Sequence, residues 1–256
     1  MSEVSVVIPT KNRKEFLLRA ARSALAQTFA PKEVIVVDDG SEDGTPEAVR
    51  DLGDPRVILL SSSAPGTAHA RNTGIEAARG DLIAFLDDDD EWLPEKLEKQ
   101  VPLLESGRPP ALVFADAIVE PVAEPRGRTI FSRQPPSCGR IFQSLLLDNF
   151  IPTSAVIVRK KIFETGLRFD QRFFPAEDYD LWLKISHLGR CTFSPMPLAV
   201  YHVHPGQSGN DLRLMFSSCV NAIEANLHGK GLSVREVPGL GKRIRHLNYF
   251  RENPRG

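Results

Sequence analysis

The sequence predicts an α/β protein in which a mostly parallel central sheet is covered by helices on both faces, giving three layers. Strand and helix patterns alternate through the first half of the 256 residues. The strand candidates are short and almost entirely apolar, which is typical of strands buried on both faces. Between them, apolar residues recur at the spacing of one helix face. Strands that are joined by helices in this way run parallel, through right-handed crossovers.

Four strand candidates, each followed by a helix candidate, account for the first half of the chain. The first helix is predicted because apolar residues from Phe16 to Leu25 recur at helical spacing. Pro94 suits the first turn of the fourth helix, which carries Leu97 and Val101. The strand candidates are residues 4–9, 34–37, 57–60 and 82–86. The first three helix candidates are residues 16–25, a short segment that ends at residue 49, and residues 68–78.

The second half is less regular and ends in a basic tail. A helix is predicted over 179–188, because Leu181, Trp182 and Ile185 lie on one face. Residues rich in Pro and Arg predict a loop or short hairpin over 120–137, and turn residues predict a loop over 205–209. The strand candidates are residues 112–119, 155–158 and 198–203. From about residue 211 we expect one helix and a tail with the basic residues Lys230, Arg235, Lys242, Arg243, Arg245, Arg251 and Arg255.

Composition and charge exclude several classes of protein. The chain is 41% hydrophobic and 25% charged, as ordinary globular proteins are. Its net charge of −1 gives no overall attraction for nucleic acid, so we expect no nucleic-acid partner. No stretch approaches the roughly 18 apolar residues that a membrane span needs. The widely spaced Cys138, Cys191 and Cys219 suit a reducing compartment. We therefore expect a soluble cytoplasmic protein with no transmembrane segment.

A run of carboxylates, Asp87-Asp88-Asp89-Asp90-Glu91, directly follows the strand candidate 82–86. Like charges at this spacing repel one another and disfavour the ionisation of their neighbours. A divalent cation relieves this repulsion, and carboxylate oxygens are ligands that Mg²⁺ and Mn²⁺ prefer. In open α/β sheets, ligand sites lie beyond the carboxyl ends of the strands, where this run would be. The run therefore predicts metal-assisted chemistry, and the alternative is a solvated acidic turn.

Polar residues at two other strand ends are expected to converge on the same edge of the sheet. They are the segment 9–13 (Pro-Thr-Lys-Asn-Arg) and the pair Asp38-Asp39, and Arg71-Asn72 can approach from the preceding helix. A metal, a carboxylate suited to a ribose or base edge, and arginines suited to phosphate oxygens together describe a nucleoside diphosphate site. Two alternatives stay open, because Asp39 can belong to a simple turn and Arg71 can be a solvated helix arginine.

Other phosphate-binding and metal-binding motifs do not occur in the sequence. There is no G-x-x-x-x-G-K-[ST], so the acidic strand does not belong to a P-loop protein. No G-x-G-x-x-G follows the first strand, which argues against a dinucleotide-binding fold. Trp92 stands where an EF-hand loop requires glycine.

In the second half, the adjacent carboxylates Glu177 and Asp178 open the predicted helix. Acidic residues in a first helical turn often act only as caps or dipole partners, which is one interpretation. The other is that a carboxylate held here removes a proton from an incoming hydroxyl group. His204 lies at a strand end before a loop. It is either structural or, near a metal, a ligand or a diphosphate partner.

Together these motifs resemble the large inverting glycosyltransferase family 2, whose members have the GT-A fold, a Rossmann-like three-layer α/β/α sandwich. The resemblance covers about residues 3 to 208. Each motif is weak by itself, whereas their order and spacing are specific. In order, they are VSVVIPTKNR (4–13), QTF (27–29), VVDDGS (36–41), ARNTG (70–74), FLDDDDEWLP (85–94), EDYDLW (177–182) and YHVH (201–204).

The resemblance implies a nucleotide-diphosphate sugar donor, usually UDP- or dTDP-linked, and a divalent metal, Mn²⁺ or Mg²⁺. The acceptor would be a hydroxyl group of a saccharide or glycolipid, in polysaccharide, cell-envelope or glycoconjugate synthesis. We expect a GT-A domain over 1–210, with a nucleotide-binding half (1–110) and an acceptor-binding half (111–210). A C-terminal helical extension (211–256) would follow. Its basic tail is either an ordinary solvated helix or a contact with an oligomer partner or with anionic lipid, peripherally at the inner face of the membrane.

Roles for single residues also follow from the resemblance. Asp39 would contact the base, while Arg71 and Asp88 would help to hold the nucleotide. Asp87 and Asp89 would form the metal-binding D-x-D pair, with Asp89 as the principal ligand. The nucleoside would be surrounded by Pro9, Thr10, Arg13 and Asp39.

The second half would supply the general base. Asp178 would deprotonate the acceptor hydroxyl, and Glu177 is the weaker candidate for that role and a substrate-binding residue. His204 matches the usual histidine of the family and would be a further metal ligand, whereas His202 departs from the arginine that is common at its position.

Two other functions stay open at this point. One is a metal-dependent sugar-phosphate nucleotidyltransferase, although the glycine-rich N-terminal loop of that class is replaced here by Pro9-Thr10. The other is a non-catalytic sugar-nucleotide-binding module, against which the intact Glu177-Asp178 pair argues.

Overall fold

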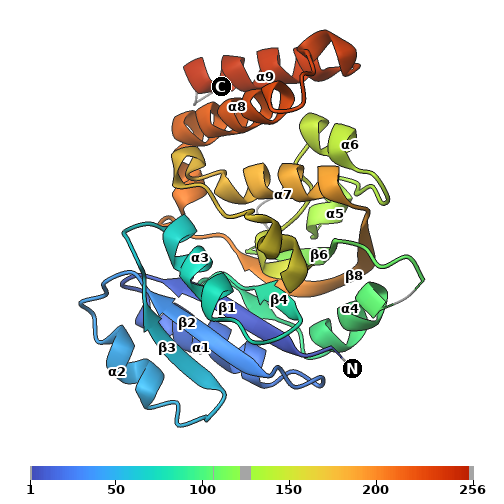
Figure 1. The fold of residues 1–256 in the computed structure, drawn as a ribbon. Coiled ribbons are helices and arrows are strands. Elements are labelled where there is room, and N and C mark those ends of the chain that lie inside the picture. Colours follow the sequence, from blue (N-terminus) through green and yellow to red (C-terminus); the bar gives the residue numbers. More distant parts are fainter. Residues whose placement is uncertain (1, 106, 122–127, 254–256) are drawn as a thin grey trace.

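A single eight-stranded sheet forms the centre of the molecule (Figure 1). The computed structural model describes residues 2–105, 107–121 and 128–253. The order of the strands across the sheet is β3-β2-β1-β4-β7-β6-β8-β5. Their bounds are β1 Val4–Thr10, β2 Glu33–Asp38, β3 Val57–Ser61, β4 Leu82–Phe85, β5 Glu91–Trp92, β6 Leu112–Glu120, β7 Ile157–Arg159 and β8 Cys191–His202.

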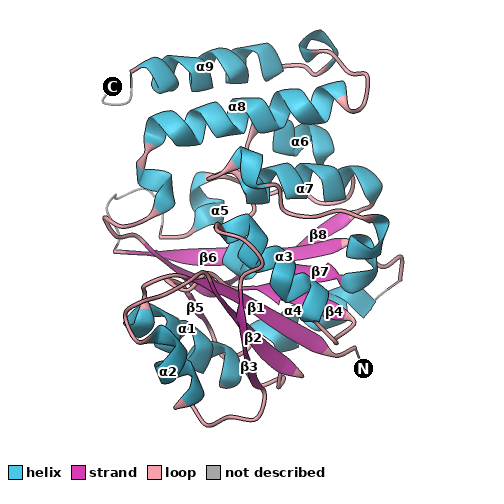
Figure 2. Cartoon of the chain, turned by 60° about the vertical axis from the view of Figure 1, so that its left-hand side comes forward, coloured by secondary structure: helices cyan, strands magenta, loops and turns pink. Residues whose placement is uncertain are grey.

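Helices cover both faces of the sheet, so the predicted three-layer arrangement is confirmed (Figure 2). The sheet needs a cover on both faces because successive side chains of a strand point to opposite sides. In β1, Val6 packs into one apolar cluster and Val7 into the other. Helices α1, α2 and α4 contribute to the first cluster, and α3, α6, α7, α8 and α9 to the second. Their bounds are α1 Lys14–Leu25, α2 Thr45–Arg50, α3 Thr67–Ala77, α4 Lys96–Glu105, α5 Ile130–Arg133, α6 Phe142–Leu147, α7 Glu177–Leu188, α8 Leu212–His228 and α9 Leu240–Glu252.

The first half of the sheet is parallel, as predicted. Strand β1 pairs in parallel with both β2 and β4, and β2 pairs in parallel with β3. Consecutive strands from β1 to β4 are joined through α1, α2 and α3, and a helix is the usual crossover between parallel strands. The carboxyl ends of β1, β2 and β4 therefore lie together at one edge of the sheet.

The second half of the sheet is mixed, which the sequence patterns did not predict. Strand β7 runs antiparallel to both β4 and β6, while β6 and β8 are parallel. Strand β8 begins at Cys191, well before the predicted segment 198–203, because its first part pairs with β6 across register shifts next to Asp116. The short β5 was not predicted, since it exists only by pairing with Ala199 and Val200 of β8.

The C-terminal segment forms two helices where one helix and a tail were predicted. Helix α9 packs along α8 (Figure 2), with Leu240 and Leu247 buried and the rings of Phe216 and Phe250 5.7 Å apart. Arg255 of the predicted tail and residues 122–127 of the predicted 120–137 loop lie outside the described residues. The described part of that loop includes the short helix α5. Among the described helices, none is both long and apolar enough to cross a membrane.

Candidate active site

A cavity of about 570 Å³ opens at the carboxyl ends of the parallel strands. Most of the residues predicted for the site line it, although they come from both halves of the chain. These are Pro9, Thr10, Arg13, Asp39, Arg71, Asp87, Asp88, Asp89, Glu177 and Asp178. His204 is the one predicted site residue that does not line this cavity, and it lies in a neighbouring hollow with Phe16 and Arg19.

The register of the parallel strands brings the polar segments together. Thr10 pairs with Asp38 at the ends of β1 and β2, and the chain leaves β4 alongside them. The hydroxyl of Thr10 donates to Asp88 Oδ2 at 2.8 Å. Asp39 Oδ2 accepts from the amide of Gly66 at 3.0 Å, which fixes that carboxylate at the cavity wall.

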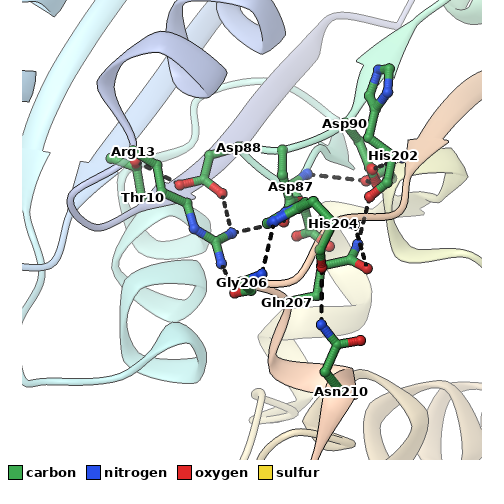
Figure 3. Close-up of polar contacts among 12 residues, drawn as sticks. Thr10, Arg13, Asp87, Asp88, Asp90, His202, His204, Gly206, Gln207 and Asn210 are labelled. Carbon is green, nitrogen blue, oxygen red and sulfur yellow. Dashed lines mark hydrogen bonds and ion pairs between the residues drawn. The ribbon is translucent and has the colours of Figure 1, made fainter. Parts of the chain in front are cut away.

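Arg13 neutralises the middle of the acidic run (Figure 3). Its Nη1 lies 3.1 Å from Asp88 Oδ1 and 2.7 Å from Asp89 Oδ2. Its Nη2 donates to the carbonyl oxygen of Gly206 at 2.7 Å, which ties the loop after β8 to the acidic run. Burial raises the pKa of Asp88 to about 6, although the charge of Arg13 opposes this shift.

Arg71 joins the acidic run to the start of α7. Its Nη2 donates to Asp87 Oδ1 at 2.6 Å and its Nη1 to Glu177 Oε1 at 2.8 Å. The side chain is buried, with the guanidinium 5.1 Å from the centre of the Phe169 ring. Burial opposes the charged form, but Asp87 and Glu177 outweigh it and raise the pKa of Arg71. Arg71 is therefore not a solvated helix arginine, and its two terminal nitrogens are occupied by protein carboxylates.

Asp178 lies at the cavity and is held by a threonine that the sequence analysis did not single out. Its Oδ2 accepts a hydrogen bond from Thr153 Oγ1 at 2.5 Å, and its Oδ1 accepts from the amide of Tyr179 at 2.6 Å. Burial raises the pKa of Asp178, while the Thr153 hydrogen bond and the charge of Arg71 lower it. The outcome is a carboxylate more basic than an exposed aspartate.

Ser154, next to Thr153, was also missed. Its hydroxyl donates to Asp90 Oδ2 at 2.5 Å and accepts from the amide of Asp87 at 3.1 Å. Asp90 is 2% exposed, and its burial raises its pKa well above the ordinary value. The segment 152–155 therefore supports both the acidic run and Asp178. Only Pro152-Thr153-Ser154 hints at this in the sequence, and such residues are common in any turn.

His204 contacts the acidic run from the neighbouring hollow. Its Nε2 lies 2.9 Å from Asp89 Oδ2, and its ring stacks on Phe16 with the ring centres 5.1 Å apart. Within the described residues, no three His, Cys, Asp or Glu side chains form a group that could hold a metal ion. Mg²⁺ commonly uses one or two carboxylates together with substrate phosphates. Asp87 and Asp89 line the cavity and suit such a shared site, and their assignment as ligands stays a prediction.

Asp88 gives a pH-dependent contribution to stability whose sign is fixed by its raised pKa. Its carboxyl group has a pKa of about 6 in the folded state and about 4 when unfolded. The stabilising contribution is therefore complete below pH 4 and is lost as the pH rises through 6. We expect the free energy of unfolding of Asp88→Asn, relative to wild type, to rise by about 2 kcal/mol between pH 4 and 7. Urea unfolding without divalent cations measures this, and a pH-independent difference contradicts it.

Comparison with known proteins assigns the family. The family model described as glycosyl transferase family 2 matches residues 5–167. Succinoglycan biosynthesis protein ExoO of Rhizobium meliloti is 33% identical, with 98% of this chain and 74% of ExoO covered. The Escherichia coli UDP-Glc:alpha-D-GlcNAc-diphosphoundecaprenol beta-1,3-glucosyltransferase WfaP is 31% identical, with 80% of this chain and 79% of WfaP covered.

Solved structures agree on the fold. The structure of S. aureus TarS in complex with UDP-GlcNAc has a TM-score of 0.74 at 18% identity, covering 96% of this chain and 72% of that one. Mannosyltransferase PcManGT from Pyrobaculum calidifontis, in complex with GDP-Man and Mn²⁺, has a TM-score of 0.69 at 21% identity, covering 98% and 70%. The chain therefore belongs to glycosyl transferase family 2 and is a glycosyltransferase with the GT-A fold.

Proposed function

We propose that the enzyme transfers a sugar from a nucleoside-diphosphate sugar to a hydroxyl group of a saccharide acceptor, with inversion at the anomeric carbon. One observation carries the proposal. The ends of three parallel strands bring cationic and acidic side chains into a single cavity that also contains Asp178, the basic carboxylate at the start of α7. A donor with a charged diphosphate and an acceptor with a hydroxyl proton need these two kinds of group.

The donor would bind in the half formed by residues 1–110. Lys11 and Arg13 are cations suited to phosphate oxygens, and Asp39 is a carboxylate suited to the base or ribose. TarS has been solved with UDP-GlcNAc and PcManGT with GDP-Man and Mn²⁺, which supports a nucleotide-sugar donor. We propose a UDP- or dTDP-linked sugar as donor, and residues 111–210 as the main source of acceptor contacts.

The transfer breaks the bond between the anomeric carbon and the diphosphate oxygen and forms a bond to the acceptor oxygen. The acceptor proton passes to the carboxylate of Asp178, which lies against the cavity. Bound at Asp87 and Asp89, Mn²⁺ or Mg²⁺ would supply positive charge next to the departing diphosphate. Arg71 would hold Asp87 and Glu177 in place and add positive charge at the same side of the cavity.

The names of the relatives point to the biological setting. ExoO is a succinoglycan biosynthesis protein, and WfaP is named as acting on a saccharide that is linked to a lipid diphosphate. We propose that this enzyme likewise extends a polysaccharide precursor, and that its acceptor is a saccharide carried on a lipid.

Two measurements test the proposed function. Thermal unfolding with Mn²⁺ and a panel of UDP-, dTDP- and GDP-sugars should identify the donor, because a ligand that binds the folded state raises its stability. Turnover of that donor should release the nucleoside diphosphate. Release of pyrophosphate from a nucleoside triphosphate and a sugar phosphate would instead identify a nucleotidyltransferase, and binding without turnover a non-catalytic module.

Asp89→Ala tests the metal-linked part of the donor site. We expect the variant to lose the Mn²⁺-dependent gain in affinity for the donor, weakening binding by at least about tenfold, because that gain requires a shared ion. Calorimetric titration with and without Mn²⁺ measures it. Asp54→Ala is a matched control, since the one ion pair that Asp54 forms among the described residues is with Arg56, and Asp54 lies outside the cavity. Equal Mn²⁺ dependence in Asp89→Ala and wild type would remove Asp89 from the metal site.

A further inference from the structure

Exposed apolar and cationic side chains gather where the first turn of α8 meets the last turns of α9. We call this surface the α8–α9 edge. Leu212 and Leu214 are each 41% exposed and Tyr249 is 56% exposed, which makes them three of the most exposed large apolar side chains in the described residues. The two segments are neighbours, because Phe216 and Phe250 are in ring contact and the C-terminal end of α9 lies beside the start of α8 (Figure 2). The edge consists of Leu212, Arg213, Leu214, Arg245, His246 and Tyr249.

The charge of this edge is positive. Arg213 and Arg245 are exposed, and within the described residues neither forms an ion pair. The carboxylates of Asp211 and Glu252, which flank this edge in the sequence, are already engaged. Asp211 accepts from the amide of Leu214 and so caps α8, and Glu252 lies 3.7 Å from Arg251. Leucines beside unpaired arginines and a tyrosine are the side chains that hold a helix in the surface of an anionic bilayer.

The same helix forms part of the rim of the active-site cavity. Met215, one residue beyond the exposed Leu214, lines the cavity. Further along α8, Ser218 Oγ donates to the carbonyl oxygen of Phe174 at 2.7 Å, and Phe174 also lines the cavity. Asn226 Nδ2 donates to Asp180 Oδ1 at 2.8 Å, which fixes α8 to α7. A membrane in contact with Leu212 and Leu214 would therefore lie next to the cavity rim.

We propose that the α8–α9 edge binds the surface of an anionic membrane and so places the cavity at the level of the lipid headgroups. The membrane contact follows from the edge itself. The further step, that the contact delivers a lipid-carried acceptor to Asp178, rests on the proposed function. A soluble protein partner is the competing occupant, and it would not require anionic lipid.

Sedimentation with vesicles tests the contact. The wild-type enzyme is expected to sediment with phosphatidylcholine vesicles that contain phosphatidylglycerol, and not with phosphatidylcholine alone. Leu212→Ser combined with Leu214→Ser should weaken binding by at least tenfold, because both apolar side chains leave the bilayer surface. Leu188→Ser is the matched control, since Leu188 is 52% exposed at the end of α7 and is not part of the edge. Equal binding by all three proteins, or no binding by wild type, overturns the proposal.

The electrostatic part has its own variants. Each arginine should contribute about fivefold to the affinity for the membrane, so Arg213→Gln combined with Arg245→Gln should weaken binding about 30-fold. Arg108→Gln, which changes an exposed arginine outside the edge, should leave binding unchanged. Raising the salt concentration from about 0.1 to 1 M should release the wild-type enzyme, because it shortens the reach of surface charges. If neither the salt concentration nor the arginine substitutions change vesicle binding, an anionic membrane is not the occupant.

Failure of this proposal can be told apart from failure of the proposed function. Thermal stabilisation by UDP, dTDP or GDP with Mn²⁺ reports on the nucleotide site, and it should be the same in wild type and in the edge variants. Loss of vesicle binding with unchanged nucleotide stabilisation supports the edge as a separate surface. If the leucine variant loses both, the edge is part of the nucleotide site and the proposal is wrong.

Discussion

Replacing Asp178 by asparagine is expected to lower kcat by about 10²- to 10⁴-fold while leaving the affinity for the donor unchanged. The amide keeps the size of the carboxylate. Its oxygen can accept from the amide of Tyr179 and its NH2 group can donate to Thr153 Oγ1, so the local structure should persist. It cannot take a proton, so the acceptor hydroxyl would attack without a base. Steady-state rates at saturating donor, together with calorimetric donor titration, separate the two effects. Unchanged turnover would remove Asp178 from the role of base.

The pH dependence of the reaction provides a second test of the same residue. Burial raises the pKa of Asp178. As the pH is lowered, the rate should therefore begin to fall at a higher pH than it would with an ordinary aspartate as the base. Thr153→Val removes a hydrogen bond that lowers this pKa. The acid limb of its pH–rate profile should therefore move to higher pH. Thr28→Val, whose hydroxyl bonds Glu98 far from the cavity, should leave the profile unchanged.

Local patterns predicted the part of the fold that is built from neighbouring segments. Strands β1 to β4 and helices α1 to α4 were predicted because strands and helices alternate closely along this part of the chain, and the spacing of apolar residues shows that order. The antiparallel β7 and the two-residue β5 depend on partners far away in the chain. A pattern within one window contains no information about such partners. For this reason the direction of β7 and the existence of β5 could not be predicted.

The candidate site also has a part that local sequence patterns predicted and a part that they could not predict. The acidic run was recognisable because four aspartates after an apolar strand are unusual, and its convergence with Thr10 and Asp39 follows from the parallel register. The supports of the site were not recognisable. Thr153 and Ser154 come from a turn of ordinary composition, and their contacts with Asp178 and with Asp87 appear only when this turn is placed against the end of β4 and the start of α7.

Arg71→Leu is expected to destabilise the fold by about 3–5 kcal/mol, because it leaves Asp87 and the buried Glu177 without their shared cation. Arg50→Leu is the matched control. Arg50 pairs with Glu47 on the surface of α2, where both side chains are more than 60% exposed, and such pairs contribute only about 0–1 kcal/mol. Urea unfolding of both variants at pH 7 measures the difference. Equal destabilisation would show that the Arg71 bridge has no special energetic role.

Lowering the pH should partly rescue Arg71→Leu, and this distinguishes lost charge from lost packing. Burial raises the pKa of Glu177, and the charge of Arg71 lowers it, so removing Arg71 raises this pKa further. A raised folded-state pKa of a carboxyl group gives stability that is complete at low pH and is lost as the pH rises. The difference in the free energy of unfolding from wild type should therefore shrink between pH 7 and pH 5, whereas a packing defect is independent of pH.

Arg71→Lys restores one charge but cannot reach two carboxylates in the planar, two-armed geometry of a guanidinium. It should recover part of the stability and little of the activity, because only arginine holds Asp87 and Glu177 together at the cavity.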